Sequence, residues 1–505
     1  MASSSAQQYG WIHDGFVNSW TRHNDGKLAA KIQKKWLRHR FLNAISFNSR
    51  AKPSIFLLLR EWLQICDKDH TGCHRRPEMD DFWPRRVIYV GDRRQLTLVE
   101  EQHRGDDYLV LSHCWGLPED ETKAEEEKNR VCTTPKNYKD RLHGFGYDEL
   151  PKTFQDAIQV TRALGKNYLW IDALCIIQGP GGDWNSEAGT MASIFAYAYC
   201  TIAASSAPGW ADGFLSAQPD SLVQGTLSAP TCACDFDKDV EGGNLMKRAW
   251  VLQERVLSRR IIHFTSTHIY SECGNGVLCE KLTNLTPPLG KQRFFLDPNF
   301  PSRLNEAGYL RTVDFVQFLF RKYSTSGLTF AADRDVAIYS LVKRMGEVLE
   351  TEVRYGIFHC FLGSLLLWKR DENKTSPISY GDRSVPSWSW MAYPGGIDFI
   401  LAANQDLEVP RDVDLGFIED GKALNVKVRK FLGSMWFDVV GYIRLEDCNC
   451  VVVGMVRDKK KEGALQTYHV LIIREKVGGG GYKRVGVGKM EARYISRDYV
   501  AGTLW

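Results

Sequence analysis

The sequence lacks a long apolar segment, and its first residues lack the composition of a leader. Its longest apolar stretch, residues 356–368, is 13 residues long and contains a histidine, too short to span roughly 30 Å of hydrocarbon. Residues 1–16 have neither the basic start and apolar run of a secretory signal nor the arginine-rich character of a transit peptide. We therefore expect no membrane span and a cytoplasmic location.

The chain also lacks a dense cysteine framework and a strong net charge. Its 13 cysteines are an odd number scattered through 505 residues, which is typical of reduced, buried thiols. The net charge is only +4 from 65 basic and 61 acidic side chains. Composition therefore gives no reason to expect nucleic acid, an anionic membrane or an acidic substrate, and partners must be inferred from individual sites.

Several common motifs are missing. There is no GxSxG elbow, Walker P-loop or GxGxxG, and the four glycines at 478–481 lie in a predicted hairpin turn. We find no ankyrin, WD or leucine-rich repeat. A cysteine nucleophile is disfavoured at Cys114, because it and His113 are neighbours that point to opposite faces of an extended strand. Cys175 with a distant histidine stays open as an alternative.

Two segments precede the main domain. Residues 1–60 are predicted to be helical, and the stretch 27–41 is basic and amphipathic. We interpret that stretch as a docked surface helix, with calmodulin-type binding or contact with a membrane surface as alternatives. Residues 61–105 are predicted to form a lead-in helix and strand.

The lead-in segment contains a cluster of thiol and imidazole side chains. Its members are Cys66, His70, Cys73 and His74. Their spacing is compatible with zinc, because Cys-x3-His on a helix places both ligands on one face. Four ligands so close together would crowd, so the alternative is a helix end with incidental cysteines and histidines. We predict no metal or cofactor, with zinc at these residues as the alternative.

Residues 106–283 are predicted to alternate strands and helices. Residues 108–112 form an apolar strand, a helix runs from about Pro151 to Gly165, and residues 168–171 form a second apolar strand. A strand, a helix of about a dozen residues and another strand make a βαβ unit.

A further helix near 187–198 and a third strand at 200–204 follow. Ligands of open α/β sheets collect beyond the C-terminal ends of the strands. Residues 112–116, 172–178 and 205–213 are therefore predicted to converge on one edge, which is the predicted site.

Four blocks in this order resemble the heterokaryon-incompatibility (HET) domain of filamentous fungi. The first block is matched by Leu111, Ser112, Trp115 and Gly116, with His113 in place of the usual tyrosine. The second is matched by Trp170, Ile171, Asp172, Leu174, Cys175, Ile176 and Gln178, with Ile177 in place of asparagine. The third is matched by Met191, Ile194 and Ala198, with Phe195 in place of tyrosine. The last is matched by Arg248, Trp250, Gln253, Glu254, Arg255, Leu257, Ser258 and Arg260.

The resemblance implies an α/β fold similar to Toll/interleukin-receptor (TIR) domains and flavodoxin, with a mostly parallel sheet flanked by helices. In enzymatic TIR domains the glutamate of a Trp-Cys-x-x-Glu helix is required to cleave the nicotinamide–ribose bond of NAD. Trp250 and Glu254 reproduce that spacing, which implies Glu254 as the catalytic residue and NAD as the substrate. The implied substrate-binding residues are Ser112, His113, Trp115, Gly116, Asp172, Cys175, Gln178, Trp250, Arg248 and Arg255.

One carboxylate suffices for this chemistry. Cleavage develops oxocarbenium character on the ribose, which an anion bonded to the ribose hydroxyls stabilises. Each residue also has a structural alternative. Glu254 can be a salt-bridged helix residue, Asp172 can cap the following turn, and Trp115 and Trp250 can belong to the core.

Residues 300–505 are predicted to form a mixed, strand-rich α+β domain, with strands around 435–457 and 467–487. The resemblance implies a role in self/non-self recognition and programmed cell death, with hydrolysis of NAD. The alternative is a non-catalytic signalling module that acts through self-association or partner proteins.

Overall fold

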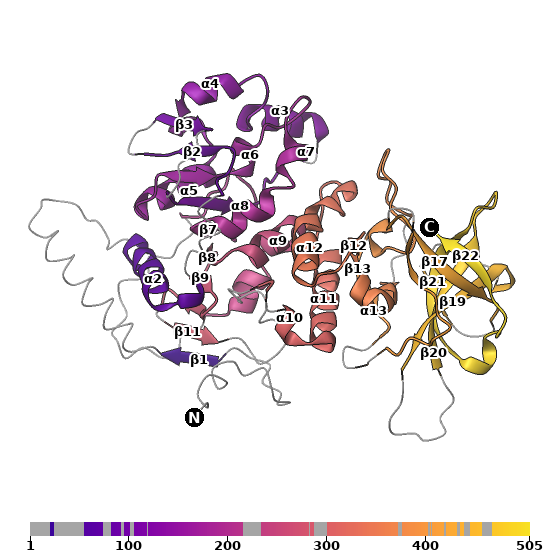
Figure 1. Cartoon of the computed structure of the whole chain (residues 1–505). Coiled ribbons are helices and arrows are strands. Elements are labelled where there is room, and N and C mark those ends of the chain that lie inside the picture. Colours follow the sequence, from indigo (N-terminus) through magenta and orange to yellow (C-terminus); the bar gives the residue numbers. More distant parts are fainter. Residues whose placement is uncertain are drawn as a thin grey trace, which may run out of the picture. The chain divides into compact units, whose positions relative to one another are not determined.

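The computed structural model divides into two compact units, Met1–Phe300 (unit 1) and Pro301–Trp505 (unit 2), both drawn in Figure 1. Each unit is described by itself. The structure describes residues 21–24, 55–73, 82–91, 95–100, 106–118, 120–215, 234–281, 283–286, 300–302, 304–371, 376–401, 405, 407–418, 421–431, 435–438, 445–456 and 467–505. The basic segment 27–41 lies outside these residues.

Unit 1 is built on a mixed sheet of eleven strands, in the order β1-β11-β10-β9-β8-β7-β4-β6-β2-β3-β5. The strands are β1 (Thr21–Asn24), β2 (Val87–Tyr89), β3 (Gln95–Val99), β4 (Tyr108–Ser112), β5 (Phe145–Gly146), β6 (Tyr168–Trp170), β7 (Cys200–Ala203), β8 (Arg260–Phe264), β9 (Ile269–Cys273), β10 (Gly276–Cys279) and β11 (Thr283–Thr286). The helices are α2 (Ile55–Asp69), α3 (Glu121–Val131), α4 (Tyr138–His143), α5 (Lys152–Ala163), α6 (Asp172–Cys175), α7 (Trp184–Glu187), α8 (Met191–Tyr197) and α9 (Ala249–Leu257).

Only the centre of this sheet is parallel. β4 pairs in parallel with β6 and β7, and β7 pairs in parallel with β8. The other strand pairs are antiparallel, so the expectation of a mostly parallel sheet is wrong outside the central four strands. The reason is the length of the connections. β8, β9 and β10 are joined by short turns, which permit only antiparallel neighbours, whereas a parallel neighbour requires a long crossover.

The direction of the crossovers reverses at β4. The chain runs from β4 through α5 to β6 on one side, and returns through α8 to β7 on the other side. Because parallel crossovers are right-handed, α5 covers one face of the sheet and α8 and α9 cover the other. α8 and α9 pack against each other. The C-terminal end of β4 is therefore a switch point of the strand order.

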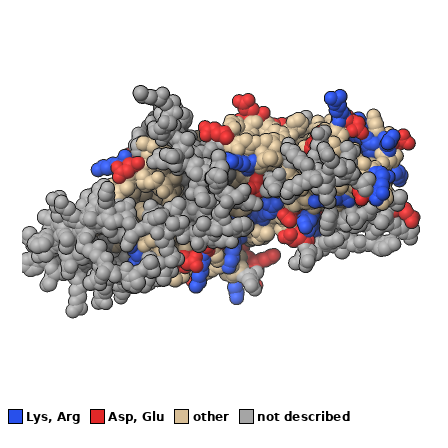
Figure 2. Space-filling model, turned by 90° about the horizontal axis from the view of Figure 1, so that it is seen from below, with Lys and Arg blue, Asp and Glu red and all other residues tan. Residues whose placement is uncertain are grey.

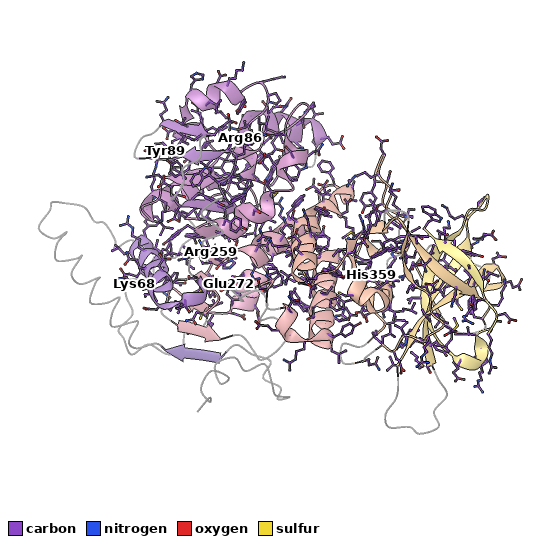
Figure 3. All side chains as sticks on the ribbon, viewed as in Figure 1. Lys68, Arg86, Tyr89, Arg259, Glu272 and His359 are labelled. Atoms are coloured by element: carbon purple, nitrogen blue, oxygen red, sulfur yellow. The ribbon has the colours of Figure 1, made fainter. Side chains whose placement is uncertain are left out.

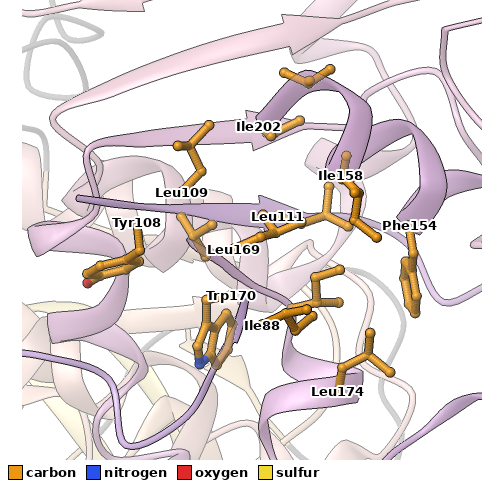
Figure 4. Close-up of a cluster of buried hydrophobic side chains, with 14 of the residues drawn as sticks. Ile88, Tyr108, Leu109, Leu111, Phe154, Ile158, Leu169, Trp170, Leu174 and Ile202 are labelled. Carbon is orange, nitrogen blue, oxygen red and sulfur yellow. The ribbon is translucent and has the colours of Figure 1, made fainter. Parts of the chain in front are cut away.

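The core of unit 1 surrounds β4, of which every residue is buried. Figure 4 shows side chains from three parallel strands and from α5 meeting there, among them Leu109, Leu169, Ile202 and Phe154. A strand covered on both faces can be apolar throughout, which explains the unbroken Tyr-Leu-Val-Leu run. Each large apolar side chain buried in this way contributes about 1.5–3 kcal/mol.

The helices between β4 and β7 follow local sequence signals. The charged run 119–130 contains α3, which begins after Asp120, and the Asp120 side chain accepts from the Lys123 N–H at 2.9 Å. The helix expected near 187–198 is shorter and is preceded by α7. Gly189 separates the two, as expected of a residue with poor helix propensity.

Unit 2 combines helices with an antiparallel-rich sheet of seven strands. The sheet has the order β16-β17-β19-β20-β21-β18, and β22 pairs with β17 and β21. Its strands are β16 (Gly416–Ile418), β17 (Ala423–Arg429), β18 (Met435–Phe437), β19 (Cys448–Met455), β20 (Thr467–Glu475), β21 (Tyr482–Glu491) and β22 (Val500–Leu504). Shorter pairs are β12 (Val353–Arg354) with β13 (Ile357–Phe358) and β14 (Trp368–Arg370) with β15 (Ile397–Phe399). The helices are α10 (Leu304–Ala307), α11 (Tyr309–Ser324), α12 (Val336–Val348) and α13 (Leu362–Leu366).

The strand-rich character expected of this region is confirmed, and the glycines at 478–481 form the predicted turn of the β20–β21 hairpin. A buried cation joins this sheet to its neighbours. Arg484 of β21 pairs with Asp438 at 2.6 Å, and its guanidinium lies 3.5 Å from the centre of the Trp368 ring.

The surface carries both signs of charge. On the face drawn in Figure 2, basic and acidic side chains of the described residues lie among one another rather than in separate fields, in keeping with the small net charge. Within the described part of the chain, no helix has the length and apolarity needed to span a membrane.

Candidate functional site

The first block of the candidate site is the C-terminal end of β4 and the turn that follows. Ser112 is the last residue of the strand. Gly116 has a φ of 64°, and a Cβ at this position would lie 2.4 Å from the Cα of Gly209. Both the backbone conformation and the close approach require glycine at this point. The turn is thereby held against the loop that follows β7.

Asp172 enters the site from the neighbouring strand. It begins α6 two residues after β6 ends. Its Oδ2 accepts from the indole N–H of Trp115 at 2.9 Å, and its Oδ1 accepts from the N–H of Ala173 at 2.7 Å. The side chain is 20% exposed. Asp172 thus joins the first turn of α6 to the turn after β4.

Glu254 reaches the same place from α9. The Ser112 hydroxyl donates to its Oε2, and the residue is only 7% exposed. Burial raises the pKa of Glu254 to about 7; the Ser112 hydrogen bond and the Arg248 charge oppose this rise, and the Asp172 charge adds to it. A buried carboxyl that titrates near neutral pH is the type of group that functional sites contain.

The arginines beside Glu254 in the sequence have other partners. Arg248 donates to the backbone carbonyl of His113. Arg255 is buried between Glu241 and Glu272, with 2.8 Å to the latter. Although burial opposes it, these carboxylates raise the pKa of Arg255. These hydrogen bonds and ion pairs join the two arginines to groups other than Glu254.

The structure consequently does not bring Arg255 together with Ser112 and Glu254. Its guanidinium is held in a buried network in which Glu272 also contacts His263 at 2.6 Å. Figure 3 labels Glu272 on β9. Successive helix residues are about 100° apart around the axis. Arg255 therefore faces a different region from Glu254.

His113 is a buried neutral ring. It is 3% exposed, and its Nδ1 lies 3.8 Å from Asp172 Oδ1. Burial lowers its pKa to about 4, so the ring is uncharged at neutral pH. It packs edge-on against Phe154, with 5.0 Å between ring centres. Its contribution to the site is therefore shape and polarity rather than positive charge.

Indole rings from four elements lie around this group. Trp115 packs against Trp210 at 5.4 Å between ring centres, and Trp250 meets Trp184 edge-on at 5.5 Å. Trp115 and Trp250 are half-buried. The sequence patterns did not indicate Trp184 or Trp210 as site residues. The position of Trp210 within 205–213, a turn predicted to reach this edge, was the available signal.

Cys175 and Gln178 support the loop after β6. The Cys175 thiol is fully buried, and burial raises its pKa to about 12. A thiol that stays protonated is a poor nucleophile, which disfavours the cysteine alternative. Gln178 donates to the carbonyl of Asp172 at 3.3 Å. Cys175 and Gln178 thus stabilise the segment that begins with Asp172, Cys175 by packing in the core and Gln178 by its hydrogen bond.

The cysteine and histidine cluster lies elsewhere in unit 1. Cys66, His70 and Cys73 come together, and Cys273 of β9 joins them. His74, the fourth member expected from the sequence, lies outside the described residues.

Comparison with known proteins identifies the segment that holds the site. Residues 108–254 match the model of a family described as Heterokaryon incompatibility protein (HET). The match begins at the first residue of β4 and ends at Glu254, so it contains Ser112, Asp172 and Glu254. Searches of curated proteins and of solved structures found no match. The family match supports a heterokaryon-incompatibility domain at these residues and suggests a role in that process.

Proposed function

From the presence of a heterokaryon-incompatibility domain at residues 108–254, we propose that this domain hydrolyses NAD and that Glu254 is the catalytic carboxylate. The observation that carries the proposal is the contact between Glu254 and Ser112 at the end of β4, beside Asp172. Three chain segments far apart in sequence bring these groups to one place.

The topology favours a ligand at this point. In open α/β sheets, crevices for ligands form beyond the strand ends where the strand order reverses. β4 is that strand, since β6 and β7 lie on its two sides. Ser112 ends β4, and Asp172 follows β6. We also propose that the domain is similar to TIR domains, because Ser112 ends a central strand and Glu254 lies four residues after Trp250 on a helix.

The chemistry suits a buried carboxylate with a raised pKa. In NAD the nicotinamide ring is cationic, and its charge favours the ionised form of Glu254 when substrate binds. As the bond from ribose C1′ to nicotinamide breaks, the electron pair moves to the ring nitrogen and positive charge develops on the ribose. Glu254 accepts hydrogen bonds from the ribose hydroxyls and stabilises that charge. Water then adds to C1′ and loses a proton, which gives ADP-ribose and neutral nicotinamide.

The surrounding residues have supporting roles in this proposal. Ser112 fixes the orientation of the carboxylate through its hydroxyl. The half-buried Trp115 and Trp250 offer ring faces for nicotinamide or adenine. Arg248 is the remaining cation of the predicted set at this edge, and guanidinium groups suit pyrophosphate.

The alternative is a non-catalytic signalling module that acts through self-association or a partner protein. The low exposure of Glu254 favours it, because a carboxylate already bonded by Ser112 can serve to hold α9 against β4. The domain surface around Asp172 would then be an interface rather than an active site.

The test is NAD turnover by the purified full chain, followed as loss of NAD and appearance of ADP-ribose. We expect the unaltered chain to consume NAD and Glu254→Gln to consume none. The matched control is Glu280→Gln. Glu280 is also buried, with a pKa raised by burial, but it accepts from the Ile269 N–H away from β4. A chain that never consumes NAD, together with full incompatibility activity of Glu254→Gln in cells, would refute the enzymatic proposal.

A further inference from the structure

A second polar cluster in unit 1 consists of Cys66, His70, Cys73 and Cys273. Each offers one ligand atom, and these atoms all lie within 4.8 Å of one another. Cys66 belongs to α2, Cys73 to a single 3-10 turn (Thr71–Cys73), and Cys273 ends β9. The first three residues are close in sequence, whereas Cys273 lies 203 positions after His70.

The local fold explains why the first three side chains meet. The His70 N–H donates to the Cys66 carbonyl at 3.3 Å, which continues the helical turn and places both side chains on one face. The Cys73 N–H donates to the His70 carbonyl at 2.8 Å, so the chain folds back over the helix end. This turn therefore brings the Cys73 thiol next to the side chains of Cys66 and His70.

The fourth side chain arrives because α2 packs against β9. Figure 3 labels Lys68, in the last turn of α2, and Glu272, which precedes Cys273, on the same side of unit 1. Cys273 supplies the fourth ligand in place of His74. Four ligands within nine residues are therefore not needed, and the crowding expected from the sequence does not arise.

We propose that Cys66, His70, Cys73 and Cys273 bind one zinc ion. Zinc takes four thiolate and imidazole ligands in a tetrahedron, with Zn–S near 2.3 Å and Zn–N near 2.0–2.1 Å, which sets ligand atoms about 3.5–3.8 Å apart. The distance from Cys273 Sγ to His70 Nδ1 is 3.4 Å. All three cysteines are free thiols, so each has its sulfur available.

The next layer of contacts fits a metal at His70 Nδ1. The side-chain amide of Asn275 lies 2.9 Å from His70 Nε2. With Nδ1 on the metal, Nε2 keeps its proton and donates to the amide oxygen, since the two ends of an asparagine amide are interchangeable by a flip. The backbone N–H of Asn275 donates to Cys273 Sγ at 3.4 Å, which stabilises a thiolate.

Positive charge also lies beside the cluster. Arg259 and Arg260 donate to the carbonyl of Cys73 at 3.2 and 3.3 Å. Three thiolates and one neutral imidazole around Zn²⁺ leave a net charge of about −1, which these guanidinium groups offset.

The site is structural rather than catalytic. Four protein ligands leave no open position for water or substrate, and Cys66 and Cys73 are 4% and 1% exposed. The ion would tie the end of α2 to β9. Two of its ligands, His70 and Cys273, are 203 positions apart in the sequence. Closing so long a loop stabilises the fold by restricting the unfolded chain.

The test is the zinc content of the full chain purified without chelators. We expect about one zinc per chain, lost in Cys273→Ser and Cys66→Ser. The control is Cys360→Ser, which alters an exposed cysteine of unit 2 and should keep the metal. Cobalt added to metal-free unaltered chain should give the thiolate-to-cobalt charge-transfer absorption, and Cys273→Ser should weaken it.

A substitution that keeps all four ligands guards against misfolding as an explanation. Asn275 is exposed, and Asn275→Ala should weaken zinc binding roughly 10- to 100-fold while the far-ultraviolet circular dichroism stays unchanged. Three results would overturn the proposal: a folded chain free of zinc that binds no cobalt, a Cys273→Ser chain that retains full zinc, or a disulfide between two of these cysteines. Because the assay measures metal, its failure leaves the NAD proposal untouched.

Discussion

Replacing Glu254 by glutamine should make the protein more stable above pH 7 and leave its stability near pH 4 unchanged. Burial raises the pKa of Glu254 from the ordinary 4.5 to about 7. The folded protein therefore holds this proton more tightly than the unfolded chain does. Glutamine has the shape of the protonated carboxyl, and its side-chain oxygen can accept from Ser112 as Oε2 does now.

The size of the effect follows from the difference in pKa. A difference of about 2.5 units corresponds to about 3 kcal/mol at 1.36 kcal/mol per unit. Below pH 4.5 the carboxyl is protonated in both states, and its stabilising contribution is fully present. Between pH 4.5 and about 7 the unfolded chain loses the proton first, so stability falls as pH rises. Above pH 7 the loss is complete, whereas glutamine does not titrate.

Thermal unfolding of both proteins between pH 4 and 8 measures this effect. Comparing the two Tm values at each pH cancels the other titrating groups, and we expect Glu254→Gln to gain several degrees by pH 8. Glu126→Gln, at an exposed position of α3, should follow the unaltered chain. Parallel pH profiles for the Glu254→Gln and unaltered chains would show that the carboxyl is not desolvated and would refute the reasoning.

Two further predictions concern the same edge of the sheet. Asp172→Asn should move the pH-dependent loss of stability to lower pH, because the Asp172 charge raises the pKa of Glu254. Thermal unfolding over the same pH range measures this shift. An unchanged midpoint pH of the stability loss would contradict the coupling between the two carboxylates. Gly116→Ala should lower the free energy of unfolding by about 1–3 kcal/mol, because its Cβ would lie 2.4 Å from the Cα of Gly209. Gly165→Ala is the control, since Gly165 also has a positive φ but a Cβ there meets nothing within 4 Å; urea unfolding should show the smaller loss for Gly165→Ala, and equal losses would mean that the close approach does not matter.

The central elements could be predicted because local pattern determines them. The strand expected at 108–112 is found as Tyr108–Ser112, and the helix expected between Pro151 and Gly165 is found as Lys152–Ala163. Continuous apolar runs mark strands covered on both faces, and helical spacing of apolar residues marks a helix that covers them. The order of these elements also brought Ser112, Asp172 and Glu254 to one edge.

Other features depend on tertiary contacts that no local pattern encodes. Cys273 lies about 200 residues from its three partners, and only the packing of α2 on β9 brings it to them. The position of Arg255 has a simpler explanation. Trp250 and Glu254 are four residues apart and share a helix face, whereas Arg255 is turned away by about 100°. Helix geometry alone could have separated it from the binding set.

The hydrogen bond between Ser112 and Glu254 joins residues 142 positions apart, which has a consequence for protein synthesis. A chain leaves the ribosome N-terminus first, and domains fold as they emerge. β4, α5, β6 and β7 are therefore made before α9, and any product that stops before residue 254 lacks the carboxylate. If the proposed activity is NAD hydrolysis, unfinished chains carry none of it. The order of elements along the chain would thus delay the proposed activity until α9 has been translated.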